Sequence, residues 1–302
     1  MEQINFKKLG NGYVLVDYNT FKKLNPLTFD YAWNFNNGVA IVKLEGKYNV
    51  INKQGELLWK EDKWLDDVYD FHEGFAIVKI EGRGYNFINE QGELLWDKDI
   101  WFDKTSDFDK GFAMVYIDGK GWNYINTQGE LLWKCDKWFN ENDNFVNGFA
   151  IVYVEGKGYN FIKTNGELLW EEDNSFEYIG NFSEGFAWVK KEGQGFNFIN
   201  QQGELLWKGD IWFDNVEDFH EGFAWVKKEE QGYNFINKQG ELLWKGNKWF
   251  ESVCNFRKHL DKKLAGVYES DKGFNYITSE GELIYKEDKW SDKLWDFSIL
   301  LV

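Results

Sequence analysis

The stretch GYNFINEQGELLW, residues 84–96, returns along the chain with little change. Copies of its inner glycine, which opens the phrase GELLW, lie 37 residues apart, except for the last pair, which lie 41 apart. A fixed period of this length indicates one supersecondary unit copied along the chain. The seven copies of this turn glycine are Gly55, Gly92, Gly129, Gly166, Gly203, Gly240 and Gly281.

Each unit has the sequence pattern of short strands separated by turns. Residues 75–80 and 85–89 are rich in β-branched and aromatic side chains, which predicts two strands joined by a glycine-rich turn. Residues 93–96 follow a turn that ends in glycine and are expected to form a third strand. Residues 101–108 are expected to form a fourth strand or an extended turn. No stretch shows helical periodicity, so we expect an all-β repeat protein.

The two ends of the chain look like degenerate parts of the same unit. Residues 4–7 align with residues 76–79, residues 12–17 align with residues 84–89, and residues 290–297 repeat the fourth element. The phenylalanine that closes this element occurs eight times, at Phe35, Phe71, Phe108, Phe145, Phe182, Phe219, Phe256 and Phe297. We therefore expect one β-repeat domain over residues 1–302, with units near 1–35, 36–71, 72–108, 109–145, 146–182, 183–219, 220–256 and 257–297 and a tail at 298–302.

Repeated β-units of this kind end either in a ring or in an open spiral. Eight units fit the four to eight blades of a β-propeller, and ends that start and stop inside a unit could complete one blade together. We therefore expect a closed eight-bladed β-propeller. The alternative is an open β-solenoid, but solenoids usually carry distinct polar caps, whereas these ends look like degenerate copies of the unit. One tryptophan per unit, four residues after the turn glycine, suits a wedge between neighbouring sheets. These structural docking residues are Trp59, Trp96, Trp133, Trp170, Trp207 and Trp244.

The composition excludes several classes of partner. The formal net charge is −16 and 20% of the residues are aromatic. A surface this acidic repels nucleic-acid phosphates and anionic lipid, so we expect neither partner. The sequence shows no membrane-length apolar run and no secretory leader, which predicts a cytoplasmic location, with secretion left open. Cys135 and Cys254 share no metal-ligand spacing and are expected to be reduced thiols.

The repeat resembles a known family. The phrase YNFINxQGELL, followed by W-F-D-x-V-x-D-F and G-F-A-x-V, is similar to the bacterial WG-repeat family over nearly the whole chain. The eponymous Trp-Gly dipeptide is replaced, for example by Tyr85-Asn86 and Trp122-Asn123. The resemblance implies interaction modules rather than a particular chemistry. The spacing from Gly92 to Trp96 is also similar, more weakly, to the docking motif of eight-bladed quinoprotein-type propellers, which implies the architecture alone.

An acidic column occupies the fourth element, five residues before its phenylalanine. If this element were the innermost strand, the column would line a channel and attract hard cations or basic peptides. The alternative is that these side chains bond backbone groups at turns. The candidate acidic channel residues are Asp66, Asp103, Glu177, Asp214, Glu251 and Asp292.

A column of asparagines stands beside an aromatic residue in each unit. Repeated aromatic-plus-amide sites can bind sugars several times over, whereas a buried amide would complete the hydrogen bonds of adjacent strands. The candidate ligand-binding residues are Asn86, Asn123, Asn160, Asn197, Asn234 and Asn275.

These patterns favour binding over catalysis. No serine or cysteine recurs with a histidine at a useful spacing, and the copies stay alike where an enzyme would normally break their symmetry. We expect a noncatalytic, monomeric scaffold that binds a protein partner through a rim or loops, with no catalytic residue, metal or cofactor. Multivalent carbohydrate binding and cation binding by the acidic column are the alternatives.

Overall fold

The computed structural model describes residues 4–60, 64–97, 101–134, 138–170, 176–208, 212–245, 249–259, 262–285 and 290–291. Every regular element in these residues is a β-strand, and the strands form eight small antiparallel sheets. The prediction of an all-β repeat protein is therefore confirmed. The described residues hold no helix long and apolar enough to span a membrane.

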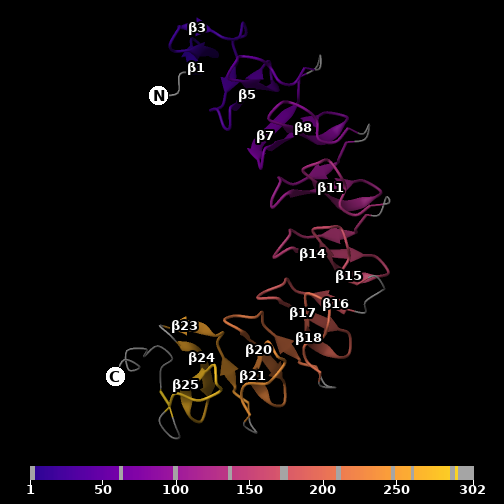
Figure 1. The fold of residues 1–302 in the computed structure, drawn as a ribbon, viewed down its shortest axis with the longest axis vertical. Helices are drawn as coiled ribbons and strands as arrows, with labels where there is room; N and C mark the ends of the chain where they lie inside the picture. Colours follow the sequence, from indigo (N-terminus) through magenta and orange to yellow (C-terminus); the bar gives the residue numbers. More distant parts are fainter. Residues whose placement is uncertain are drawn as a thin grey trace. The chain divides into compact units, whose positions relative to one another are not determined.

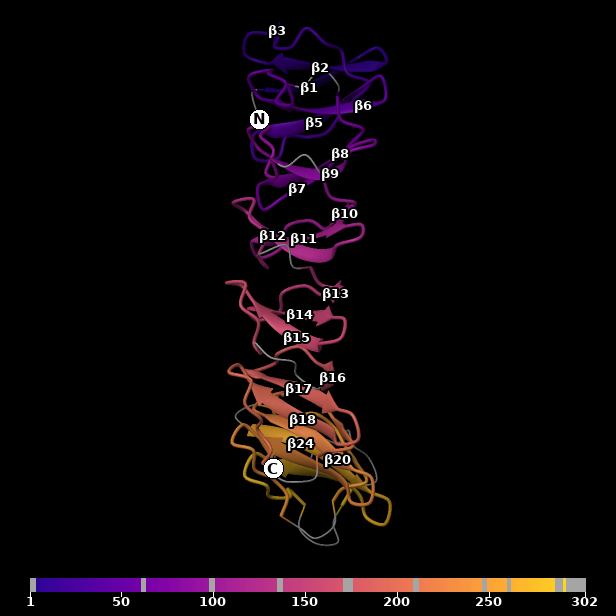
Figure 2. The same ribbon diagram turned by 90° about the vertical axis from the view of Figure 1, so that its right-hand side faces the viewer.

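The chain divides into two units, and the first, Met1–Glu141, holds four sheets that follow one another in chain order (Figures 1 and 2). The first sheet contains β1 (Ile4–Leu9), β2 (Gly12–Asp17) and β3 (Lys22–Lys23). The second contains β4 (Tyr31–Ala32), β5 (Val39–Leu44) and β6 (Lys47–Asn52). The third contains β7 (Asp67–His72), β8 (Phe75–Ile80) and β9 (Gly84–Asn89), and the fourth contains β10 (Lys104–Thr105), β11 (Phe112–Ile117) and β12 (Gly121–Asn126).

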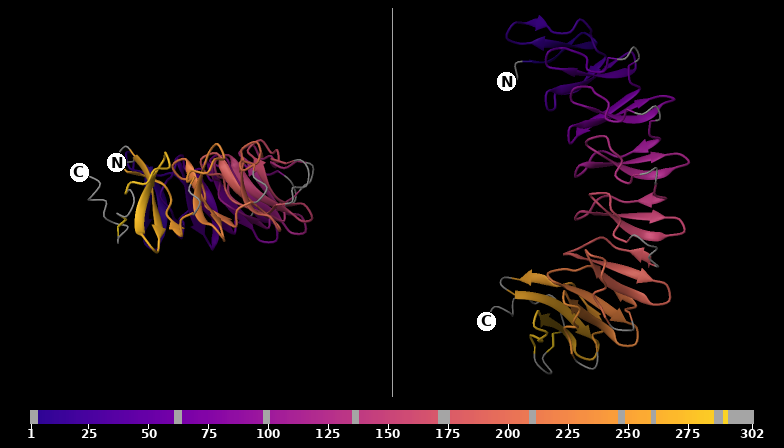
Figure 3. Two further views of the ribbon diagram at one scale, coloured as in Figure 1. Left: turned by 90° about the horizontal axis from the view of Figure 1, so that it is seen from below. Right: turned by 45° about the vertical axis from the view of Figure 1, so that its right-hand side comes forward.

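The second unit, Asn142–Val302, repeats this arrangement and is drawn from pink to yellow in Figure 3. The fifth sheet contains β13 (Glu141–Asn142), β14 (Phe149–Val154) and β15 (Gly158–Lys163). The sixth contains β16 (Phe176–Ile179), β17 (Phe186–Lys191) and β18 (Gly195–Asn200), and the seventh contains β19 (Asn215–Val216), β20 (Phe223–Lys228) and β21 (Gly232–Asn237). The eighth contains β22 (Ser252–Val253), β23 (Arg257–His259), β24 (Lys262–Glu269) and β25 (Gly273–Thr278).

A long hairpin forms the centre of each sheet, and its alternating side chains build the cores on both faces. In the third sheet, Ala76 and Val78 pack in one core with residues of the second sheet. Their neighbours Ile77 and Phe87 pack in another core with residues of the fourth sheet. Both faces of this strand are therefore apolar and covered by neighbouring sheets.

The GELLW phrase is not the regular strand that the sequence predicts. In residues 93–96 a single bridge pairs Leu94 with Ile88, and Leu95 N–H donates to the carbonyl of Phe87. Beyond this pair, the backbone of the phrase bonds to side-chain groups, described below, and not to another strand. The β-ladder therefore ends after one bridge. The equivalent segment of the first sheet is the two-residue strand β3.

The fourth element is also much shorter than residues 101–108. In the fourth sheet only Lys104–Thr105 forms a strand, which pairs with β11 at the sheet edge. Phe102 bridges back to Tyr85 of the third sheet instead. The longest copy, β7, has a register shift between Val68 and Phe71. This element therefore links two sheets and does not form a full strand of either one.

One detail of the sequence alignment needs correction. Lys8 pairs with Tyr13 as Lys79 pairs with Tyr85, so Ile4 is the counterpart of Phe75 and the predicted register is one residue off. The cause is the hairpin turn, which is shorter in the first sheet.

The longer last spacing of the turn glycines reflects an insertion near residue 260. There β23 pairs with β24 up to His259 and Lys262, which lengthens a hairpin of the eighth sheet, with residues 260–261 outside the described part.

Neighbouring sheets come into close contact at the turn glycine. A Cβ atom built on Gly92 would lie 2.5 Å from the carbonyl oxygen of Leu58 in the preceding repeat, and one on Gly240 would lie 2.6 Å from that of Leu206. Both glycines also have a positive φ, which L-residues rarely adopt. The fixed spacing of these glycines thus reflects a contact between sheets as well as a turn.

Candidate functional site

The buried asparagine of each unit holds the backbone of the GELLW phrase. The side-chain oxygen of Asn86 accepts hydrogen bonds from the N–H groups of Phe87 (2.7 Å) and Trp96 (3.2 Å). Its Nδ2 donates to the carbonyl of Trp96 at 2.8 Å. The same clamp occurs at Asn49, Asn86, Asn123, Asn160, Asn197, Asn234 and Asn275.

This placement corrects the proposal of sugar binding through the asparagines. Asn86, Asn123, Asn197, Asn234 and Asn275 are 0% exposed, and Asn160 is 8% exposed. Their amides are engaged with backbone groups, so a ligand outside the protein cannot reach them. The alternative interpretation, an amide that completes the hydrogen bonds of adjacent segments, describes what these residues do.

The acidic column lies beside hairpin turns of the same sheets. In three of these aspartates, Oδ2 accepts a backbone N–H at 2.7 Å. Asp66 accepts that of Glu81, Asp103 that of Asp118, and Asp214 that of Glu229. Glu251 accepts the N–H and the hydroxyl of Ser270, at 3.1 and 3.0 Å, and Glu177 forms an ion pair with Lys190 at 3.0 Å. Asp292 lies outside the described residues.

The acids are therefore bound to the backbone of nearby turns and to lysine side chains. The N–H of Glu81 and the ammonium group of Lys47 hold the pKa of Asp66 below its usual value. Within the described residues, no group of three or more His, Cys, Asp or Glu side chains is arranged to hold a metal ion.

The docking tryptophans lie in or beside the cores between sheets. Trp59 is 4% exposed and belongs to the core shared by the second and third sheets. Trp96 packs on the core of the third and fourth sheets, and Trp170, Trp207 and Trp244 occupy the same place in the second unit. Trp133 stacks on Phe139 with 4.0 Å between ring centroids.

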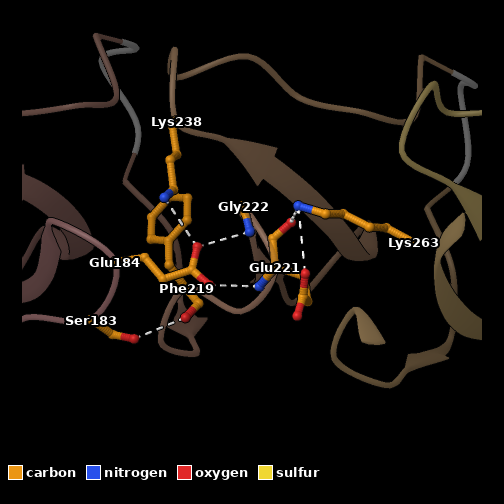
Figure 4. Close-up of polar contacts among 7 residues, drawn as sticks. All are labelled: Ser183, Glu184, Phe219, Glu221, Gly222, Lys238 and Lys263. Carbon is orange, nitrogen blue, oxygen red and sulfur yellow. Dashed lines mark hydrogen bonds and ion pairs between the residues drawn. The ribbon is translucent and has the colours of Figure 1, made fainter. Parts of the chain in front are cut away.

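A row of two-residue turns carries a further contact that the sequence analysis missed. Glu73, which follows His72 in the turn between β7 and β8, accepts the N–H groups of Lys110 (2.9 Å) and Gly111 (2.8 Å) in the next repeat. Glu184 binds Glu221 and Gly222 in the same way, at 2.7 and 2.8 Å (Figure 4). We name this arrangement the carboxylate socket, and the recurring Glu-Gly-Phe phrase is its sequence signal.

Lysines reinforce the socket in the second unit (Figure 4). Lys238 lies 3.1 Å from the carboxylate of Glu184. Burial alone would raise the pKa of Glu184, but Lys238 and the two backbone donors outweigh it, so the pKa is lowered. In the eighth sheet the insertion supplies Lys263, which donates to the carbonyl of Glu221 at 2.9 Å.

Exposed aromatic residues gather at the short first strands of the sheets. Tyr31 is 49% exposed, Trp33 37%, Tyr69 43% and Tyr178 48%. Tyr31 and Tyr178 both pair with a lysine of the neighbouring strand, Lys43 and Lys190, so they occupy the same place in their sheets. The sequence analysis does not identify these side chains, because they occur in only some of the repeats.

The solved structures that match this chain do so with low sequence identity and low TM-scores. BamB from Moraxella catarrhalis is 13% identical with a TM-score of 0.29, covering 88% of this chain and 94% of that one. AztD from Citrobacter koseri is 12% identical with a TM-score of 0.29, covering 93% of both chains. The computationally designed Ika8 protein is 12% identical with a TM-score of 0.32, covering 88% of this chain and 91% of that one. No match was found among curated proteins.

The comparison with family models gives a specific result. The model described as "WG containing repeat" matches the chain at four places, residues 21–48, 65–83, 175–194 and 213–231. Each match includes the short first strand of a sheet and part of the hairpin that follows it. The resemblance to the WG-repeat family is therefore confirmed at these four segments of the chain.

Proposed function

We propose that this chain is a noncatalytic scaffold that binds a protein partner through the rim formed by the short first strands. The supporting observation is the exposure of Tyr31, Trp33, Tyr69 and Tyr178 on these strands or, for Trp33, directly after one. Tyrosine and tryptophan are enriched among the residues that dominate binding energy at protein interfaces. Exposed aromatic side chains at a few places on a repeated framework are typical of a recognition surface.

The repeated polar residues support a structural framework rather than a catalytic centre. The asparagines clamp backbone, the acids bind turns, and Glu73 and Glu184 tie one repeat to the next. Because these roles recur from sheet to sheet, the polar residues best suited to chemistry are already used in holding the repeats. A rigid array with variable rim residues is the common design of repeat scaffolds.

The test is affinity capture with two baits. The native chain and a variant with Tyr31, Trp33, Tyr69 and Tyr178 changed to serine are incubated with lysate of the source cell at physiological salt. We expect at least one protein to be retained by the native chain and lost from the variant, and the purified protein to bind the native chain directly. Equal retention by both baits, or none by either, contradicts the proposal.

The arrangement of the eight sheets also stays a proposal. A closed eight-bladed β-propeller is supported by the number of sheets and by the repeat-like ends. The open β-solenoid is supported by the first sheet, where Asn5 and Lys7 stand in place of the buried Ala76 and Val78. Polar residues on the free face of a terminal repeat are typical of a cap, so we favour the open alternative.

A further inference from the structure

Four aromatic side chains form a continuous patch over the first and second sheets, and we name Tyr13, Tyr31, Trp33 and Tyr48 the aromatic patch. The ring centroids of Tyr13 and Tyr31 are 5.7 Å apart, those of Tyr31 and Trp33 are 4.6 Å apart, and those of Trp33 and Tyr48 are 6.0 Å apart. Tyr31 and Trp33 are the exposed members. The patch therefore presents two accessible rings supported by two half-buried ones.

The two exposed rings break the symmetry of the repeat. The places of Tyr31 and Trp33 are taken by Lys104 and Ser106 in the fourth sheet, and the remaining sheets carry Asp67 with Tyr69, Glu141 with Asp143, Tyr178 with Gly180, Asn215 with Glu217, and Ser252 with Cys254. Packing of the repeat accommodates all of these residues. Two adjacent aromatic residues at this position are thus a feature of the second sheet rather than a requirement of the fold.

Lysines already occupy other aromatic rings beside the short first strands. The ammonium group of Lys43 lies 4.7 Å from the ring centroid of Tyr48, and Lys8 lies 5.9 Å from that of Tyr13. Lys190 lies 5.3 Å from the ring of Tyr178. Among the described residues, no lysine or arginine lies over the rings of Tyr31 or Trp33. These two rings can therefore receive a cation from another molecule.

Ring geometry separates a cationic ligand from a sugar. Neighbouring rings of the patch are inclined by 56°, 62° and 40°, so they do not form the flat platform on which a polysaccharide chain would stack. The net charge of −16 attracts cations and disfavours anions. Asp30, an exposed carboxylate that accepts the N–H of Glu45 at 2.7 Å, directly precedes Tyr31 in the chain.

We propose that the aromatic patch is the docking site for an arginine- or lysine-bearing segment of a protein partner, whose cationic groups lie against Tyr31 and Trp33. This inference rests on the proposed scaffold function and adds the position and the chemistry of the contact. Arginine fits best, because its planar guanidinium group stacks on aromatic faces and is weakly hydrated.

The test uses a fluorescein-labelled peptide of alternating arginine and glycine, with anisotropy measured at physiological salt. Trp33→Ala and Tyr31→Ala are each expected to weaken binding by about tenfold, in the range of a desolvated cation–π contact. Tyr178→Ala is the matched control, because Tyr178 is equally exposed but its ring carries Lys190. We expect this control to change binding less than twofold. Trp33→Phe keeps an aromatic face and should retain most of the affinity.

Three outcomes would overturn the proposal. They are equal loss in Tyr178→Ala, no loss in either patch variant, and binding of a soluble cello- or chito-oligosaccharide in place of the peptide. Net charge is the same in all the variants, so the non-specific attraction of a cationic peptide to an acidic chain cancels in the comparison. If affinity capture finds a rim-dependent partner but the peptide result is negative, the scaffold function stands and the cationic contact falls.

Discussion

At the scale of the residue, each buried asparagine provides hydrogen-bond partners for the backbone of a segment that has no strand beside it. The Trp207 backbone finds both its donor and its acceptor in the side chain of Asn197, at 3.1 Å each. The same side chain also accepts the N–H of Phe198 at 2.7 Å. One side-chain amide therefore replaces a pair of β-ladder hydrogen bonds. The backbone can then diverge from the sheet after the tryptophan.

Asn197→Ala should destabilise the sixth sheet by about 3 kcal/mol, because the buried Phe198 N–H loses its acceptor and the Trp207 backbone loses two partners. Asn200 provides a control from the same repeat, since its side chain also accepts two N–H groups but lies at an open turn. For Asn200→Ala we expect about 1 kcal/mol or less, because water can replace those bonds. Hydrogen exchange of the Phe198 amide, supported by urea unfolding, measures the difference. Similar losses in the two variants would contradict the clamp.

The carboxylate socket predicts a pH dependence at the level of one residue. Because the pKa of Glu184 is lowered in the folded state, its contribution to folding stability is fully present above the unfolded-state pKa of 4.5. It is lost as the pH falls below 4.5 and through the folded pKa. Glu184→Gln should therefore lower the urea midpoint at pH 7, and the deficit should shrink near pH 3. One third of the side chain is exposed, so the effect should stay below about 1 kcal/mol.

Glu230→Gln is the control for the loss of a charge, since Glu230 is an exposed turn residue outside the socket. It should leave the urea midpoint nearly unchanged at both pH values. If the two variants behave alike, the socket contributes nothing beyond net charge.

At the scale of the element, neighbouring sheets are held at the distance that the turn glycine permits. Gly240→Ala would place a Cβ atom 2.6 Å from the Leu206 carbonyl oxygen, so the seventh sheet would have to move away from the sixth. Gly193→Ala is the matched control: its φ of 71° is also positive, but nothing lies within 4 Å of the added carbon. Both variants carry the strain of a positive φ, about 1 kcal/mol.

We expect Gly240→Ala to cost at least about 2 kcal/mol more than Gly193→Ala, because the collision is with backbone. Urea unfolding followed by tryptophan fluorescence measures this difference, since Trp207 lies in the core shared by these sheets. Equal costs in the two variants would mean that the glycine is required only for the turn.

The elements also show what a sequence pattern can and cannot predict. The hairpin β8–β9 was predictable, because alternating apolar residues and glycine turns act within a few residues of each other. The end of the ladder at Leu94 was not predictable, since it depends on Asn86, ten residues before the tryptophan that it clamps. The same limit applies to the site: the asparagine column was visible, but its burial depends on neighbouring sheets. Tyr31 and Trp33 were not predictable from the repeat, because this aromatic pair occurs in the second sheet and is not copied at the equivalent positions.

At the scale of the whole molecule, the stability of a repeat array is approximately the sum of its units and the interfaces between neighbours. The terminal sheets therefore decide whether the array closes. On the first sheet, Lys7 is exposed at the position where Val78 is fully buried, and Phe21, 79% exposed, holds the left-handed position of the turn where later repeats carry the docking glycine. A sheet packed against this face in the usual way would bury an ammonium group and collide with the phenyl ring.

The open arrangement can be tested by one distance between two hairpin turns. Spin labels on cysteines at Asn11 and Asp271, in the first and eighth sheets, report whether these sheets are neighbours, and a pair at Glu81 and Asp118 gives the distance for two adjacent sheets. The native Cys135 and Cys254 are replaced by serine in both. Because Lys7 and Phe21 disfavour packing on the first sheet, we expect the Asn11–Asp271 distance to exceed the reference distance by severalfold. Equal distances would establish a closed ring and refute the capping role of these residues.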